Sequence, residues 1–178
     1  AYTEIKLPSL APNPYVSVIV LEYSERPAIA DGLAAKTSDG GYALNMSNQN
    51  PVNPAVSINM KARRESIPEH ASVSSPTTLK WKIYVDEPGE KLLDISYSSG
   101  ETSGESKFLI QLAGKKMVHN VVPTGKTVGE PNADWVIDSF ESHRVGKVSF
   151  SEPGIFEIVL EIVPANNEEL NIQWIWII

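Results

Sequence analysis

The sequence predicts an all-β protein, folded as a two-sheet antiparallel β-sandwich. The phrase KIYVDEPG at Lys82–Gly89 returns as KVSFSEPG at Lys147–Gly154. A Pro-Gly pair between two alternating apolar runs favours a tight turn, because Pro fixes one φ angle and Gly accepts a positive one. Each copy is therefore interpreted as a β-hairpin. No helical stretch is evident between the copies, which favours a sandwich over a nucleotide-binding or barrel enzyme fold.

The first predicted strand is Tyr15–Tyr23, which is dense in β-branched and aromatic residues. The dipeptides Arg26-Pro27 and Asp31-Gly32 interrupt the pattern after it. Residues 1–27 are therefore expected to form a tail that either belongs to a preceding unit or adds an edge strand. The module itself is expected to cover residues 28–178.

Alternating apolar runs predict nine strands within the module. They lie near 41–46, 55–60, 78–86, 91–98, 106–113, 116–122, 144–150, 155–163 and 170–177. Four sets of side chains are expected to face the core, because each keeps a period of two: Leu79, Trp81, Ile83 and Val85; Phe108, Ile110 and Leu112; Phe156, Ile158, Leu160 and Ile162; Leu170, Ile172, Trp174 and Trp176. Asn171 and Gln173 would then lie on the opposite face. Two longer connections, near 61–77 and 123–143, are the expected loops.

Composition narrows the possible functions. The 178 residues suit a single sandwich with a short appendage, and a net charge of −7 gives no electrostatic reason to bind nucleic acid. No apolar run is long enough to span a bilayer. The absence of cysteine excludes disulfides and thiolate chemistry. An acidic, cysteine-free sandwich suits a bacterial periplasm or cell surface, although a cytosolic protein could have the same composition. We expect a periplasmic or extracellular bacterial protein.

The residues that could support catalysis form no recognisable constellation. His70, His119 and His143 have no neighbour at metal-ligand spacing. The Gly125-Lys126-Thr127 segment ends like a phosphate-binding loop, but that motif needs glycine where Asn120 stands. No pair among the 22 carboxylates is singled out by sequence. We therefore predict no catalytic residues in this chain.

The sequence does offer the chemistry of sugar recognition. A sugar ring has an apolar face that stacks on aromatic rings and a rim of hydroxyls that need donors and acceptors. The second loop carries Asn132, Asp134 and Trp135 close together, and Tyr42 is a second aromatic beside the turn at residues 39–41. These four are candidate ligand-binding residues. The alternative for Trp135 is that it caps the core at the end of a strand.

A further set of segments follows one pattern: the strand Leu79–Val85, the turn Glu87-Pro88-Gly89, the strand Leu92–Tyr97, Trp135, Gly146, Val148, the turn Glu152-Pro153-Gly154 and the strand Leu170–Ile175. This pattern resembles the galactose-binding-type jelly roll of family 6 and family 35 carbohydrate-binding modules, over roughly residues 28–178. The resemblance implies sugar contacts from Trp135 and Asn171. It also makes a calcium ion the one cofactor to consider, although no early Glu-containing calcium segment is evident in 28–42.

The tail resembles a second known structure. The segments Leu7-Pro8, Pro12–Tyr15 and Val18–Glu22 are similar to the closing strand of the β-domain that follows the catalytic barrel in α-L-fucosidases of glycoside hydrolase family 29. The resemblance implies an upstream catalytic domain in the same polypeptide, and no hydrolysis by the present chain.

Two functions are compatible with these observations. The first is a non-catalytic module that binds an oligosaccharide or glycan and concentrates its enzyme there. The second is a structural or interaction module that packs against the catalytic domain or a protein partner without binding sugar. Replacing Trp135 by Ala would separate them. If Trp135 binds sugar, the variant loses binding and keeps its fold; if Trp135 is buried in the core, the variant loses stability instead.

Overall fold

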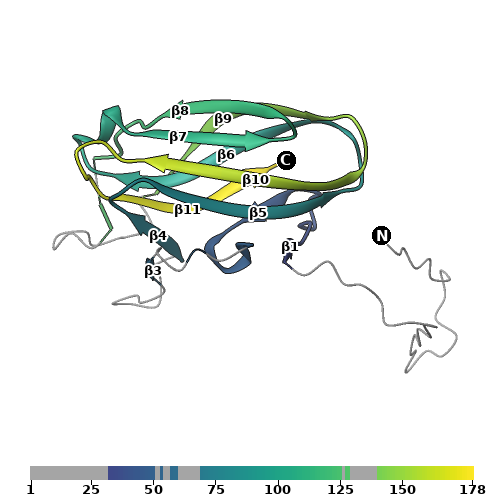
Figure 1. Ribbon diagram of the computed structural model, residues 1–178, viewed down its shortest axis with the longest axis horizontal. Helices are drawn as coiled ribbons and strands as arrows, with labels where there is room; N and C mark the ends of the chain where they lie inside the picture. The colour runs from purple at the N-terminus through teal and green to yellow at the C-terminus, as the bar shows by residue number, and fades with distance from the viewer. Residues whose placement is uncertain (1–31, 51–52, 54–56, 60–68, 126, 129–139) are drawn as a thin grey trace, which may run out of the picture. The chain divides into compact units, whose positions relative to one another are not determined.

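The computed structural model describes residues 32–50, 53, 57–59, 69–125, 127–128 and 140–178 (Figure 1). Over these residues the chain forms two facing β-sheets and two short 3-10 turns, η1 (Met46–Asn48) and η2 (Ser103–Glu105). No helix in this part of the chain is long and apolar enough to cross a membrane. The predicted β-sandwich is thereby confirmed.

The five-stranded sheet has the order β1-β5-β10-β7-β8. Its strands are β1 (Leu33–Ala34), β5 (Thr77–Val85), β7 (Lys107–Leu112), β8 (Lys115–Asn120) and β10 (Gly154–Val163). The six-stranded sheet has the path β3-β4-β11-β6-β9, with β2 also paired to β11. Its strands are β2 (Tyr42–Leu44), β3 (Ser57–Asn59), β4 (His70–Val73), β6 (Gly89–Ser99), β9 (Glu141–Phe150) and β11 (Leu170–Ile177). All pairings are antiparallel except that of β1 with β5.

The core lies between the two sheets and follows the predicted alternation on β5, β7 and β10. Leu79, Trp81, Ile83 and Val85 have no exposed surface, and Phe108, Ile110, Leu112, Ile158, Leu160 and Ile162 are at most 1% exposed. Phe156, predicted in the same set as Ile158, is only partly buried against this core. The indole of Trp81 also donates from Nε1 to the carbonyl oxygen of Asn45 at 2.7 Å, so its one polar atom is satisfied inside the core.

The interpretation of the repeated phrase as two hairpins is wrong. Each copy crosses from one sheet to the other: the first joins β5 to β6, and the second joins β9 to β10. The two crossings lie together at one end of the sandwich, because Val85 pairs with Gly154 and Gly89 pairs with Phe150 (Figure 1). Equivalent residues of the two copies thus exchange places, which relates the copies by an approximate local two-fold symmetry. Of the two glycines in the repeated phrase, Gly89 has a positive φ, of 142°, and Gly154 does not.

The prediction for the end of β11 is also wrong. Leu170 and Ile172 face the core, but the register of β11 against β6 shifts between Ile172 and Trp174. Gln173 is the extra residue of this β-bulge, and an extra residue reverses the faces of everything after it. Ile175 and Ile177 are therefore fully buried in the core, whereas Trp174 and Trp176 are half-buried on the outer face of the sheet.

Two short strands were not predicted. β1 has two residues, and β4 lies at the end of the predicted connection 61–77. The predicted strand Tyr15–Tyr23 and the boundary near Ala28 lie outside the described residues, so the division into tail and module stays a prediction.

Candidate functional site

The candidate ligand residues predicted from sequence fall into two groups. Asn132, Asp134 and Trp135 lie outside the described residues and stay predictions. Tyr42 is 1% exposed, and its hydroxyl donates to the carbonyl oxygen of Tyr84 at 2.7 Å. In this arrangement its ring packs in the core rather than standing at a surface.

Asn171 lies on the outer side of the six-stranded sheet, as expected, but it is fully buried. It stands in one rung between Ser72 of β4 and Ser98 of β6. The Ser72 hydroxyl donates to its Oδ1 at 2.7 Å, while its buried Nδ2 has no hydrogen-bond partner. A buried donor of this kind requires an acceptor, such as a bound water or a ligand oxygen.

The two tryptophans displaced by the bulge lie on the outer face of the six-stranded sheet, among residues of β6, β9 and β11. We call this surface the tryptophan face; it consists of Trp174, Trp176, Ser96, Asp94, Ser142, Arg144 and Gln173. Strand register arranges these residues in two adjacent rungs, Trp176-Asp94-Arg144 and Trp174-Ser96-Ser142. Side chains opposite one another in such rungs lie about 4.5–5.5 Å apart at Cβ. The Ser96 hydroxyl is further held by Gln173 Oε1 at 2.8 Å.

The two indoles of this face contact each other and are not coplanar. Their ring centroids are 5.6 Å apart and the planes cross at 73°. Trp176 rests on Gly41, where a Cβ would lie 2.9 Å from both the Trp176 Nε1 and the Ile177 carbonyl oxygen. A side chain at residue 41 would therefore displace the indole. The turn before Gly41 is closed by Thr37, whose amide donates to the Gly41 carbonyl oxygen at 2.8 Å.

Charged groups on this side of the sheet are paired. Arg144 forms a two-pronged ion pair with Asp94, in which Nε donates to Oδ1 and Nη2 donates to Oδ2 at 3.3 Å. The hydrogen bond to Asp94 raises the pKa of Arg144. Next to this pair, the Lys147 ammonium lies 2.6 Å from Glu90 Oε1. The face thus combines aromatic surface with fixed donors and acceptors.

The period-two pattern of β11 was visible in the sequence, but it placed Trp174 and Trp176 in the core instead of on the outer face. An Ile-Gln-Trp-Ile-Trp-Ile run fits two registers equally well, since isoleucine and tryptophan are both plausible in a core. Only the position of the bulge decides which of the two sets is outside.

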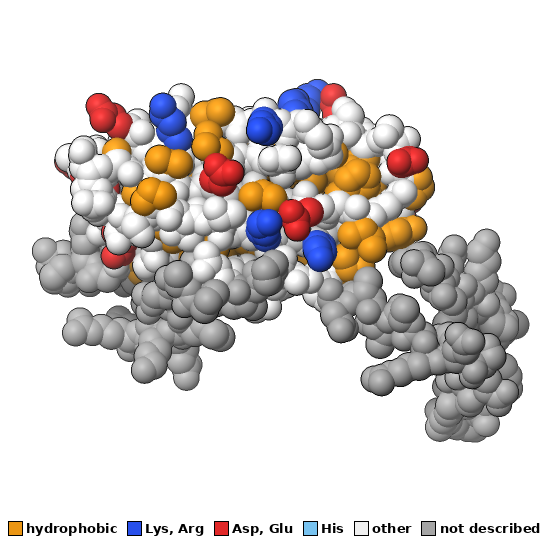
Figure 2. Space-filling view, in the orientation of Figure 1, with side chains coloured by type: hydrophobic (Ala, Val, Ile, Leu, Met, Phe, Trp, Pro, Cys, Tyr) orange, Lys and Arg blue, Asp and Glu red, His pale blue; other side chains and the backbone are white. Residues whose placement is uncertain are grey.

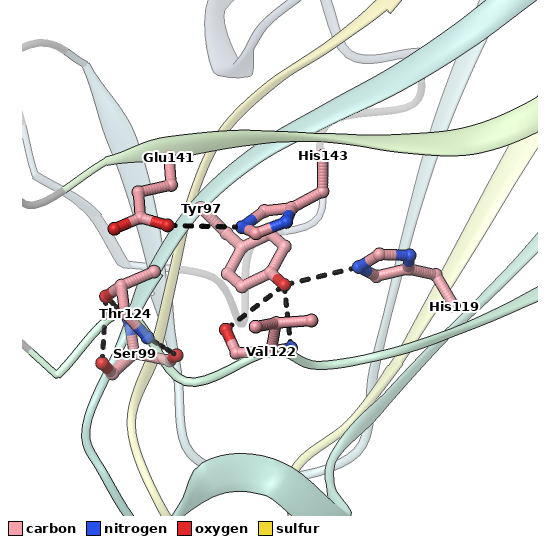
Figure 3. A network of polar contacts seen from close by, with 7 residues as sticks. All are labelled: Tyr97, Ser99, His119, Val122, Thr124, Glu141 and His143. Carbon is pink, nitrogen blue, oxygen red and sulfur yellow. Dashed lines mark hydrogen bonds and ion pairs between the residues drawn. The ribbon is translucent and has the colours of Figure 1, made fainter.

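A second cluster lies at the open side of the sandwich, where Tyr97 is the centre of a polar network (Figure 3). Its hydroxyl accepts from the Val122 amide at 2.9 Å and lies 3.2 Å from His119 Nε2. The Tyr97 ring stacks on His143 with centroids 4.7 Å apart, and His143 is 3.7 Å from Glu141. Burial raises the pKa of Tyr97; burial, and then the charge of His143, lowers the pKa of His119.

The geometry of this Tyr97 cluster indicates a structural role, in which it holds the two sheets together. Tyr97 belongs to β6, His119 to the edge strand β8 and His143 to the edge strand β9, so the cluster joins the two sheets. Thr124 extends the cluster, because its hydroxyl accepts from the Ser99 amide at 3.0 Å and donates to the Ser99 carbonyl oxygen at 2.9 Å. Among the described residues no group of three or more potential ligands could hold a metal ion.

The outer face of the five-stranded sheet is different in character. Figure 2 shows apolar side chains scattered among charged ones on this side. Val118, Ile155 and Val163 are 60%, 50% and 38% exposed, and Lys80 of β5 lies 3.6 Å from Glu157 of β10. Exposed aliphatic side chains among charged groups are ordinary for a protein surface, so this face offers no comparable site.

Comparison with known proteins finds similarity in structure only. No family model and no curated protein matches the sequence. The insecticidal crystal protein Cry2Aa matches with a TM-score of 0.60 at 15% identity, over 82% of this chain and 22% of that protein. The C-terminal CBM6 of LamC, a marine laminarinase from Zobellia galactanivorans, matches with a TM-score of 0.55 at 15% identity, over 77% of this chain and 98% of the module. A family 35 carbohydrate-binding module from Clostridium thermocellum matches with a TM-score of 0.52 at 10% identity, over 77% and 96%.

These similarities establish the fold as the β-sandwich of such modules. The chain spans less than a quarter of the length of the crystal toxin, but it corresponds to almost the whole of the two carbohydrate-binding modules. Since one fold hosts several functions, the function has to be argued from the residues of the site.

Proposed function

We propose that this module binds carbohydrate, and that the tryptophan face is where it does so. The observation that carries the proposal is the position of Trp174 and Trp176, which the bulge at Gln173 turns out of the core. A half-buried indole on an otherwise well-packed sheet provides an apolar ring face to the outside without costing the core its packing. The modules named above share the fold, which supports the proposal.

The chemistry of the face matches that of a sugar. An indole plane can stack on the apolar side of a pyranose, while hydroxyls need both donors and acceptors at the rim. Ser142 and the Asp94–Arg144 pair supply both kinds within the two rungs of the indoles, whereas the Ser96 hydroxyl is buried and bonded to Gln173. Because the two indole planes cross at 73°, they cannot form one flat platform. The face therefore suits a single sugar ring or a bent chain rather than a planar polysaccharide surface.

The loop residues predicted from sequence would form a second contact with the sugar. We propose that Asn132, Asp134 and Trp135 act as ligand residues, on the grounds of the sequence pattern given above. For Asn171, the unpartnered Nδ2 supports a role in holding a ligand or a bound water. Its complete burial means that a sugar reaches it only if the groups covering it move.

The wider setting is also a proposal. The resemblance of residues 7–22 to family 29 α-L-fucosidases supports a parent glycoside hydrolase whose catalytic domain lies upstream. In that setting the module would keep the enzyme close to its glycan, with an effective concentration determined by the linker. A periplasmic or extracellular bacterial location fits such a substrate.

The test is a glycan array followed by calorimetry on the best hit, with and without calcium. Trp174→Ala and Trp176→Ala are expected to weaken binding by about tenfold or more each, because central aromatic contacts contribute most to affinity. Val118→Thr, on the outer face of the other sheet, is the matched control and should bind like the parent.

Other results would point elsewhere. If Trp135→Ala abolishes binding while both face variants bind normally, the loop is the site and the tryptophan face is not. If no glycan binds a folded protein, the function is the alternative one, a structural or interaction module.

A further inference from the structure

Arg144 is the cation among the residues that define the tryptophan face. Its side chain is 52% exposed, and through Asp94 it stands in the same rung as Trp176. A guanidinium beside an aromatic ring would normally bind a carboxylate-bearing sugar well, because it can form two parallel hydrogen bonds to a carboxylate. In this protein that fork already faces the Asp94 carboxylate.

Asp94 is well placed to keep the fork occupied. It lies within β6 between Trp176 and Arg144, and only 17% of its side chain is exposed. An incoming carboxylate would have to displace an anion that stays next to it, and two carboxylates at one guanidinium repel each other. The neighbouring Lys147 ammonium is likewise already paired, with the Glu90 carboxylate. Over the described residues of β6 and β9 that line this face, each cation is thus matched by an anion.

Arg144 and Asp94 can still form hydrogen bonds to an uncharged ligand while they are paired with each other. A guanidinium has five N–H donors, and Asp94 uses two of them. A carboxylate has about four lone-pair positions, so Asp94 keeps acceptors for hydroxyl groups. The ion pair therefore provides donors and acceptors to a neutral sugar while providing no net charge to a charged one.

We propose that Asp94 determines the specificity of the tryptophan face: by holding Arg144 it restricts the ligand to uncharged sugars and excludes uronic acids. The inference rests on the proposed carbohydrate-binding function and adds the ligand class. It also means that a single substitution converts the face, because Asp94→Asn removes the competing charge and leaves Arg144 in place.

The experiment compares two ligands of equal length, a neutral xylo-oligosaccharide and an oligogalacturonate, by calorimetry at low and high salt. The parent protein is expected to bind the neutral ligand with little salt dependence. Asp94→Asn should gain about tenfold or more in affinity for the oligogalacturonate, and this gain should weaken with salt. The double variant Asp94→Asn with Arg144→Gln should lose the gain. Asp94→Ser serves as the second variant if Asp94→Asn does not fold.

Two results would overturn the inference. One is an oligogalacturonate that binds the parent protein as well as the neutral ligand does, with Trp176→Ala abolishing both. The other is a folded Asp94→Asn variant that keeps neutral binding and gains nothing for the uronate. Failure of the proposed function looks different, because then neither ligand binds the parent or any variant.

Discussion

The bulge at Gln173 predicts that two single-residue deletions in the same strand have very different costs. Deleting Gln173 removes the unpaired residue, so Ile172 stays opposite Tyr97 and Trp174 stays opposite Ser96 in an uninterrupted ladder. Deleting Ile175 instead moves Trp176 to the core position opposite Ile95 and turns Ile177 outwards. The first deletion preserves the faces of the strand and the second exchanges them.

The magnitudes follow from what each deletion removes. Loss of Gln173 takes away the acceptor of the Ser96 hydroxyl, which is 2% exposed, and a buried polar group without a partner costs about 1–3 kcal/mol. Loss of Ile175 forces the Trp176 indole into a core space shaped for isoleucine, while Ile178 takes the core position of Ile177. Overpacking by even a few methylenes costs about 1–3 kcal/mol, and an indole in place of isoleucine adds more than that, so the second deletion is expected to remove a large part of the stability of a typical domain.

Urea unfolding followed by far-ultraviolet circular dichroism measures the difference. The Gln173 deletion should unfold cooperatively at a moderately lower midpoint, whereas the Ile175 deletion should have a much lower midpoint. Deletion of Ile172 is the comparison on the other side of the bulge: Gln173 then falls opposite Tyr97, so the faces beyond it are preserved and the cost is that of a polar side chain at one core position. Equal midpoints for the Gln173 and Ile175 deletions would refute the placement of Trp174 and Trp176 on the outer face.

Two further predictions concern the supporting structure. Because the folded protein lowers the pKa of His119, the unfolded chain binds its proton more readily; stability is therefore retained above the ordinary histidine pKa of 6.5 and declines as the pH falls below it. In His119→Gln the loss of stability between about pH 7.5 and pH 5 should be smaller than in the parent, and an unchanged pH profile would count against the burial of a neutral imidazole beside Tyr97 and His143. For Gly41→Ala, the added Cβ at 2.9 Å from Trp176 Nε1 should shift tryptophan emission and weaken glycan binding, with Gly154→Ala, whose Cβ would meet nothing closer than 3.8 Å, as the comparison. Emission and binding identical to the parent would contradict the packing of Trp176 on Gly41.

The strands of the core were predictable because their alternation is uninterrupted. Along β5 and the middle of β10 the fully buried residues alternate with more exposed ones, so the period of two identifies the face that packs on the other sheet. The same rule failed in β11, where the bulge is a property of pairing with β6 and not of the local sequence. A two-residue strand such as β1 is too short for any periodic signal.

The repeated Pro-Gly phrase shows a second limit. Pro and Gly predicted correctly that the chain turns after Val85 and after Phe150, since both residues are buried and both are followed by a reversal. They could not tell a hairpin from a crossing between sheets, because that depends on which strands pair, and the partners here are the other copy's strands. The tryptophan face was missed for the related reason that β6, β9 and β11 meet only in the folded protein.

The strand order has a consequence for how the protein is made. β10 lies between β5 and β7 in one sheet, and β11 lies between β4 and β6 in the other, so the last two strands of the chain occupy interior positions of both sheets. Among the strands that the structure describes, only β3–β4 and β7–β8 are neighbours in both sequence and space. A nascent chain lacking these last strands has open edges in both sheets, and the pairings that close each sheet await them. Folding dominated by such distant pairings is slow, on the order of milliseconds to seconds.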